Sequence, residues 1–142
     1  MLLLSYHNSK KSLQGFRYLY LNCITEKPKG LNEEVKDYWN ELEYVYYEDE
    51  LSKINNQGFL NVENINSMKY YFPKLYRRLL ASGAQSTTIY SIQGVDSPIG
   101  LVVVLYKNDH VWNYKDYSIN VAPYIQKLSI LLDYPNIKKK NL

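Results

Sequence analysis

The side chains that could carry chemistry in this sequence are mostly aromatic and basic. Its 142 residues include 16 Tyr, 3 Phe and 2 Trp, but only 2 His and 1 Cys. A tyrosine ring can stack on a planar ligand such as a nucleobase, for about 1–3 kcal/mol per base. An arginine guanidinium can bind a phosphate or a carboxylate through paired hydrogen bonds. These residue types favour recognition of a small anionic or nucleotide ligand over nucleophilic catalysis.

Six residues are the candidates for such a ligand-binding site. Two share one face of an expected strand, and the others lie in the region that connects the strands. They are Tyr18, Tyr20, Trp39, Tyr47, Tyr71 and Arg77. Arg78 offers a second guanidinium beside Arg77. The competing interpretation is that the tyrosines are half-buried core residues whose number reflects the codon bias of an AT-rich genome, and both interpretations stay open.

The sequence has few residues that are suited to catalysis or to metal binding. Nucleophilic catalysis needs a Ser, Thr or Cys beside a base that a third group orients, and the only imidazoles are His7 and His110. The sequence has no Gly-x-Ser-x-Gly, P-loop or Gly-x-Gly-x-x-Gly motif. A structural zinc site needs about four Cys or His ligands, more than Cys23 and the two histidines supply. We predict a non-enzymatic protein without cofactor or metal, with an enzyme that uses His7 as the alternative.

Composition also bounds the class of protein. A single cysteine excludes an internal disulfide. No apolar run reaches the roughly 18–20 residues of a membrane span, and the apolar residues 1–4 are too few for a signal-peptide core. The net charge is +3, and the body without the run Lys138–Lys140 is close to neutral, which argues against binding of a nucleic-acid polymer. We expect a cytoplasmic protein without a membrane partner.

The first third of the chain shows two strands and a helix. Leu2–Tyr6 and Phe16–Ile24 have the patterns of strands and predict a hairpin with a polar turn at Asn8–Ser12. Apolar residues at helical spacing predict a helix over Glu33–Leu42.

The middle of the chain continues with helices and one short strand. A second helix is expected over Tyr47–Asn56, with the segment around Gly58 ending it, and a short strand over Phe59–Val62. We interpret the acidic run as a solvent-exposed helix face, because adjacent helical residues point in different directions. The run consists of Glu48, Asp49 and Glu50.

A further helical stretch begins near Asn66 or Ser67. Pro73 suits a first turn, an apolar stripe follows, and the pair Ser82-Gly83 ends the helix. The stripe consists of Leu75, Leu79 and Leu80.

The last third predicts a hairpin and a closing helix. The strands are Thr87–Gln93 and Ile99–Tyr106, the second a central strand covered on both faces. Gly94 in the connection can take a positive φ. The closing helix covers Tyr114–Leu132, and at Pro123 it either kinks or has its main part begin, near Ala122.

This order of elements indicates an α+β domain, an antiparallel sheet of about five to six strands with helices packed on its faces. We expect a single domain over residues 1–135, ended by Pro135, and a flexible basic tail over residues 136–142.

The pattern resembles GAF domains. The segment Pro98-Ile99-Gly100-Leu101 stands where GAF sequences carry an Ile-Gly strand. As in GAF sequences, a hairpin leads into this strand and a closing helix follows it. The opening Ser5-Tyr6-His7-Asn8, followed by Gly15-Phe16, is similar to a group of GAF-like proteins common in phage genomes. PAS-like or profilin-like folds are the alternatives. The resemblance implies a pocket between the sheet and the connecting helices.

The sequence departs from the family in two places. GAF domains usually begin with a helix, whereas this chain begins in a strand, so we expect a homo-oligomer in which another subunit covers the exposed face or edge. Tetrapyrrole-binding relatives attach their chromophore through a pocket cysteine, whereas Cys23 falls among core positions of the second strand.

Two functions from different classes follow. The first is a non-enzymatic GAF-like module that binds a small molecule such as a cyclic or modified signal nucleotide, with sequestration as an anti-defence role. The second is a protein-interaction or virion component without a ligand, since surface Tyr and Trp also enrich interfaces.

Overall fold

The computed structural model describes the backbone of residues 2–11, 17–26, 39 and 42–140. These residues form one six-stranded sheet in which all neighbouring strands are antiparallel, in the order β3-β2-β1-β6-β5-β4. The strands are β1 Leu2–Lys11, β2 Arg17–Glu26, β3 Leu42–Glu43, β4 Phe59–Val62, β5 Ser86–Gln93 and β6 Pro98–Tyr106. The predicted fold class is confirmed.

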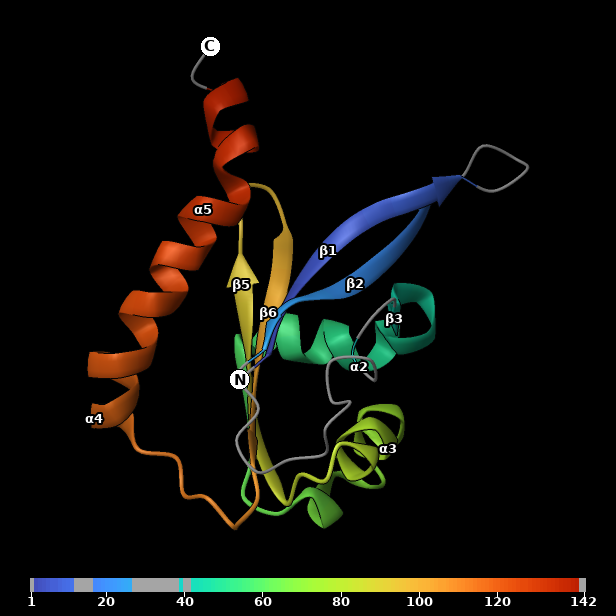
Figure 1. Cartoon of the computed structure of the whole chain (residues 1–142), viewed down its shortest axis with the longest axis vertical. Helices are drawn as coiled ribbons and strands as arrows, with labels where there is room; N and C mark the ends of the chain where they lie inside the picture. The colour runs from blue at the N-terminus through green and yellow to red at the C-terminus, as the bar shows by residue number, and fades with distance from the viewer. Residues whose placement is uncertain (1, 12–16, 27–38, 40–41, 141–142) are drawn as a thin grey trace.

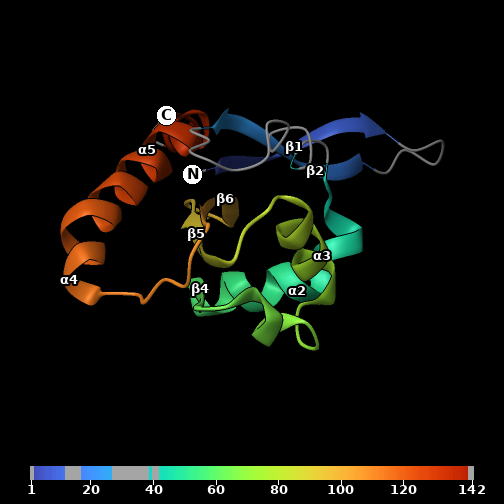
Figure 2. The same cartoon turned by 60° about the horizontal axis from the view of Figure 1, so that its bottom comes forward.

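Helices cover both faces of the sheet (Figure 1). α2 and α3 lie on one face and α5 lies along the other, as Figure 2 shows from a second direction. The helical elements are α2 Tyr44–Gln57, the 3-10 helix η1 Ile65–Met68, α3 Pro73–Ala81, α4 Tyr114–Asp116, the π-helical turn η2 Tyr117–Val121 and α5 Ala122–Lys140. In the described part of the chain, no helix is long and apolar enough to cross a membrane.

The two faces of β5 and β6 are buried in two separate apolar clusters. Ile89 and Val103 belong to the cluster under α2 and α3. Tyr90 and Val102, their neighbours along the strands, belong to the cluster that contains Leu128 of α5, because successive side chains of a strand point to opposite faces. The prediction that β6 is a central strand covered on both faces is confirmed.

The β1–β2 hairpin pairs with β6 only at its base, and the two-residue strand β3 pairs with the middle of β2. Leu2–Ser5 pair with β6, whereas β2 follows β1 as far as the pair Lys11 and Arg17. The outer half of the hairpin therefore projects away from the rest of the sheet (Figure 1). The predicted hairpin is confirmed, but the predicted turn at Asn8–Ser12 is wrong for residues 8–11, which continue the strand.

Local signals place the ends of α2 and α3 correctly. Gly58 ends α2 with a φ of +89°, and its N–H donates to Ile54 O at 2.8 Å. Pro73 occupies the first turn of α3, and Gly83 follows its end with a φ of +81°. Leu80 departs from the predicted apolar stripe, since it is 55% exposed.

Two predicted helical features are different in the structure. Residues 33–38 and 40–41 of the helix predicted over Glu33–Leu42 lie outside the described residues, and its last residue, Leu42, is in β3, where it pairs with Leu21. Glu50 does not lie on a solvated face: it is 1% exposed. Its carboxylate accepts the N–H groups of Lys74 and Leu75 at the start of α3, at 3.0 and 2.9 Å, and these bonds compensate for its burial.

The second hairpin and the last helix decide three further points. Gly94 does not use the positive φ that is open to a glycine in this turn. A Cβ there would lie 2.7 Å from Ile99 Cγ2 and 3.0 Å from the Asp133 carboxyl. At Pro123 the second alternative is confirmed, because α5 begins at Ala122 after the π-helical turn. α5 continues beyond Leu132, where the helix was expected to end, as far as Lys140.

Candidate functional site

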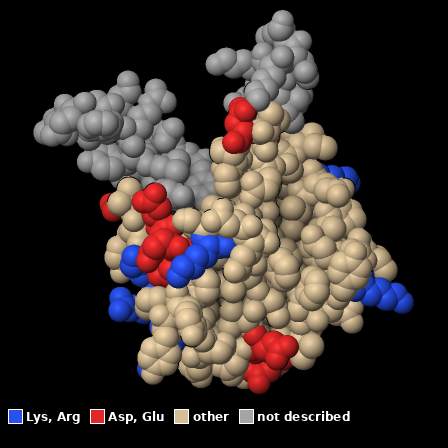
Figure 3. All heavy atoms as spheres, turned by 180° about the vertical axis from the view of Figure 1, so that it is seen from behind, with Lys and Arg blue, Asp and Glu red and all other residues tan. Residues whose placement is uncertain are grey.

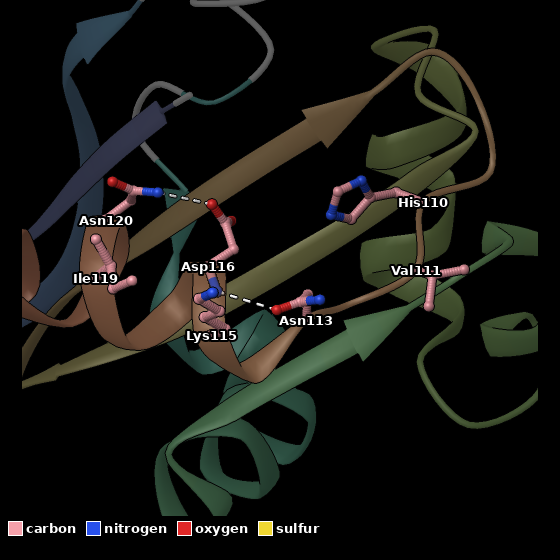
Figure 4. Close-up of a pocket in the computed structure, with 7 residues that line it drawn as sticks. All are labelled: His110, Val111, Asn113, Lys115, Asp116, Ile119 and Asn120. Atoms are coloured by element: carbon pink, nitrogen blue, oxygen red, sulfur yellow. Dashed lines mark hydrogen bonds between the residues drawn. The ribbon is translucent and has the colours of Figure 1, made fainter.

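A hollow of about 390 Å³ opens between the end of β6 and the start of the last helical segment. Figure 4 shows its lining: His110 and Val111 come from the β6–α4 connection, and the opposite wall comes from α4 and η2. The lining residues are His110, Val111, Asn113, Lys115, Asp116, Ile119 and Asn120. A volume of this size lies at the lower end of the roughly 300–1,000 Å³ that small-molecule pockets span.

His110 is held in the hollow by a stacked partner. Its imidazole lies on the ring of Tyr106, the last residue of β6, with ring centroids 3.8 Å apart and planes inclined by 8°. Tyr106 therefore covers one face of the imidazole. The uncovered part of the His110 ring lines the hollow.

The connection that carries His110 is tied to two other elements. One carboxylate oxygen of Asp109 accepts Gln85 Nε2 at 2.7 Å and Asn64 Nδ2 at 3.3 Å. The hydroxyl of Ser86 donates to Asn108 O at 2.5 Å. These bonds join the connection to the start of β5 and to the N-cap of η1, so the position of His110 follows from contacts remote in sequence.

An aromatic cluster lies next to the hollow, on the α5 side of the sheet. The Trp112 ring stacks on Phe59 of β4 with centroids 5.2 Å apart, and the Tyr90 ring stacks on Tyr117 of η2 at 5.6 Å. Trp112 Nε1 donates to the Tyr90 hydroxyl at 3.2 Å. Tyr114 completes the cluster. The cluster joins the sheet to the segment that forms the far wall of the hollow.

Two phenols of this region have raised pKa values. Burial is the largest cause of the raised pKa of Tyr90; nearby Tyr117 and Asp116 add to it, and the hydrogen bond from Trp112 opposes it. Burial also raises the pKa of Tyr106, with smaller contributions from Tyr90 and Asp116, against a hydrogen bond with Thr88. Both side chains are therefore neutral hydroxyls at physiological pH.

The far wall of the hollow is polar and locally ordered. Asn113 is the N-cap of α4, and its Oδ1 accepts the Asp116 N–H at 3.1 Å. Asn120 Nδ2 donates to Asp116 Oδ1 at 2.8 Å, one turn further on. Lys115 and Asp116 place one positive and one negative charge beside each other, and Ile119 supplies an apolar surface.

Four of the six site residues predicted from the sequence have described side chains, and none of these four lines the hollow at His110. Tyr18 and Tyr20 are on β2, where Tyr20 pairs with His7 and Glu43; their side chains, and that of His7, lie outside the described residues.

Two predicted residues, Trp39 and Tyr47, come together in the core under α2 and α3. Trp39 is 1% exposed, and its Nε1 donates to Ser82 Oγ at 2.8 Å. The hydroxyl of Tyr47 accepts Arg78 Nε at 2.5 Å. The Arg78 guanidinium also lies over the Tyr47 ring, 5.6 Å from its centroid. These contacts match the competing interpretation of core packing.

The remaining predicted residues, Tyr71 and Arg77, are exposed on that same side of the sheet. Tyr71 is 73% exposed in the turn before α3. A second hollow of about 430 Å³ near the end of α3 includes neither of them in its lining, which consists of Asn64, Ile65, Asn66, Leu80, Gly83, Ala84, Gln85 and Lys107. The ligand-binding role of the six residues stays a prediction.

The residues that form the hollow at His110 escaped the sequence analysis because their signal is weak. Aromatic residues recur between Tyr106 and Tyr117, but this spacing predicts neither the stacking on Tyr106 nor the contacts with β4 and β5. Within the described residues, no group of three His, Cys, Asp or Glu side chains could hold a metal ion.

Comparison with known proteins identifies the fold. No protein-family model matches the sequence, and no curated protein matches it. The structure is similar to a crystal structure described as a domain of a two-component sensor histidine kinase protein from Sinorhizobium meliloti 1021, with a TM-score of 0.60 and 12% sequence identity. The match covers 98% of this chain and 83% of that chain. At this level of identity the similarity concerns the fold alone, an α+β arrangement in which helices pack on an antiparallel sheet.

Proposed function

We propose that this protein is a non-enzymatic module that binds a small molecule in the hollow beside His110. The stacked pair His110–Tyr106, facing a polar wall across that hollow, is the observation that carries the proposal. An aromatic surface combined with a few placed polar groups is typical of small-molecule sites. The connection that bears His110 is tied down by Asp109, so the hollow is preformed and binding need not order it.

The side chains of the hollow suit binding better than catalysis. They carry imidazole, amide, carboxylate, ammonium and alkyl groups, and none of the described residues in the lining has a hydroxyl or thiol. Asp116 and Asn113 are engaged with each other and with Asn120 in a structural turn. These roles support recognition of a bound molecule.

A signalling use agrees with the fold. The structure of similar fold is described as part of a sensor histidine kinase, and we propose for this chain the sensing or sequestration of a small signal molecule in the cytoplasm. A cyclic or modified nucleotide, and a phage anti-defence role, are the narrower forms of this proposal that the resemblance to GAF-like proteins suggests.

We do not include a nucleic-acid polymer among the partners. On the face that Figure 3 shows, the basic groups of the described residues lie beside acidic ones or apart from one another. Lys74 Nζ, for example, pairs with Asp49 Oδ1 at 3.1 Å. A phosphate backbone is bound by clustered basic side chains.

The experiment is a screen of small molecules by thermal shift, followed by calorimetry on the hits. His110→Ala removes the stacking surface and should weaken a hit at least about fivefold, since ring stacking contributes roughly 1–3 kcal/mol. Gln126→Ala, on the exposed side of α5, is the control and should leave affinity unchanged. Arg77→Ala tests the site predicted from the sequence. If Arg77→Ala weakens the binding of a hit and His110→Ala does not, the binding site lies on the face of the sheet that α2 and α3 cover.

A protein-interaction role is the second candidate, and the outer side of α5 favours it. Ile130 and Leu131 are 59% and 70% exposed, and such apolar side chains suit the core of an interface. We propose self-association through them. Leu131→Glu should lower the mass measured by light scattering at micromolar concentration if they form the contact, and a monomeric wild-type protein would contradict it.

A further inference from the structure

The second hollow, of about 430 Å³ near the end of α3, is joined by two of its residues to the connection that carries His110. Asn64 and Gln85 line this hollow, and each donates a side-chain N–H to the carboxylate of Asp109, at 3.3 and 2.7 Å. Asp109 directly precedes His110 in the chain. A molecule that binds Asn64 and Gln85 in the second hollow therefore competes with the bonds that position the His110 connection.

The side chains that line the second hollow retain more hydrogen-bond donors than acceptors. Asn64 Oδ1 already accepts the Asn66 N–H at 3.0 Å, and Asn66 Oδ1 accepts the Tyr76 hydroxyl at 3.3 Å. Asn66 Nδ2 therefore keeps two N–H groups, and the carboxamides of Asn64 and Gln85 keep one each. Lys107 adds the N–H groups of its ammonium, whereas Gln85 Oε1 is the remaining carboxamide oxygen.

The charge of this lining decides which ligand the donors suit. Backbone carbonyls add neutral acceptors, whereas Lys107 is the single charged residue among the described residues that line the second hollow. In the described part of the chain, no acidic side chain lies within ion-pair distance of the Lys107 ammonium. An anionic oxygen would accept charge-assisted hydrogen bonds from this ammonium and from the remaining amide N–H groups, whereas a cation would meet a like charge.

We infer that the second hollow binds a small oxyanion, a carboxylate or a phosphate, through Lys107 and the three carboxamides, and that the bound anion loosens the connection that carries His110. The anion competes with Asp109 for the N–H groups of Asn64 and Gln85, and its charge repels the Asp109 carboxylate. The bonds of Asp109 are exposed, so each contributes little and is open to competition. The inference goes beyond the proposed function and does not rest on it, because neither part of it requires a ligand beside His110.

The test of the site is an NMR titration of the ¹⁵N-labelled full chain with sodium phosphate and, separately, with sodium acetate at constant pH. The side-chain amide resonances of Asn64, Asn66 and Gln85 should shift and saturate, and the tighter of the two anions identifies the source. Sodium chloride at the same ionic strength controls for screening. Lys107→Gln should weaken binding at least about fivefold, because it removes the charged donor. Lys115→Gln, which changes the net charge equally but lies in the first hollow, should leave the affinity within about twofold.

The test of the coupling is amide hydrogen exchange over residues 107–112, which should accelerate at least about threefold when the anion is saturating. Asp109→Asn keeps an acceptor for the two carboxamides and removes the like charge, so it should tighten anion binding at least about twofold.

Two results would overturn the inference. One is the absence of a saturable shift with either anion in a protein that circular dichroism shows to be folded. The other is anion binding that leaves both the exchange of residues 107–112 and the affinity of Asp109→Asn unchanged. Neither result bears on the proposed function, which is tested by compounds whose binding depends on His110.

Discussion

The carboxylate of Glu50 on α2 accepts the backbone N–H of Leu75 on α3 at 2.9 Å. Its other oxygen accepts the N–H of Lys74 at 3.0 Å. The first N–H groups of a helix have no partner within the helix, and here a buried side chain from another helix supplies it. Glu50 thereby fixes α3 against α2 on the face of the sheet opposite to α5.

Replacing Glu50 should therefore destabilise the fold. Glu50→Ala leaves the buried N–H of Leu75 and the partly buried N–H of Lys74 without an acceptor, and we expect the free energy of unfolding to fall by about 2–4 kcal/mol. Urea denaturation followed by circular dichroism measures this. Glu48→Ala on the exposed side of α2 is the control, with an expected change within about 0.5 kcal/mol. Equal effects of the two substitutions would contradict the capping role.

Gly94 is required for close packing and not for its backbone conformation. We expect Gly94→Ala to cost about 1–3 kcal/mol, because the added methyl group would overlap Ile99 Cγ2 and approach the Asp133 carboxyl. In an Ile99→Ala background, which removes that methyl contact, the cost of Gly94→Ala should be smaller. Additive losses in this double-mutant cycle would show that the contact with Ile99 is not the cause.

Stability should decline in strongly alkaline solution because of the buried phenols. The pKa values of Tyr90 and Tyr106 are raised in the folded protein. A raised pKa favours the neutral form in the folded state, so this contribution is complete below about pH 10, the ordinary tyrosine value, and is lost as pH rises through the folded values. Melting temperatures between pH 8 and 11.5 measure it. The double variant Tyr90→Phe/Tyr106→Phe should show a shallower decline, and an unchanged slope would exclude these two groups.

Asp109 should affect the hollow more than the stability of the whole fold. Asp109→Ala removes the acceptor for Gln85 and Asn64, whose bonds to it are exposed, so we expect a global loss of less than about 1 kcal/mol. Amide hydrogen exchange over residues 107–112 should accelerate, and a ligand found in the screen should bind more weakly. Unchanged exchange in this segment would show that other contacts, such as Ser86 with Asn108, are sufficient.

Local patterns in the sequence were enough for most elements of the fold. Gly58 and Gly83 stop helices because a left-handed φ is cheap only for glycine, and Pro73 starts one because its missing N–H would be unpaired there anyway. The apolar run of β6 predicts a strand covered on both faces. Such signals act over a few residues, so they can be read without knowing what lies across the sheet.

The candidate site depends instead on contacts between distant segments. His110 stands in a polar stretch of sequence, and its position beside the hollow follows from the bonds of Asp109 with Asn64 and Gln85. Glu48 and Glu50 belong to the same acidic run, and no local pattern distinguishes them. Glu50 is buried because the start of α3 lies against it. Spacing along the chain determines helix and strand, since these repeat every few residues. Which side chains share a surface is decided when the sheet and helices pack, because packing joins residues that no local repeat connects.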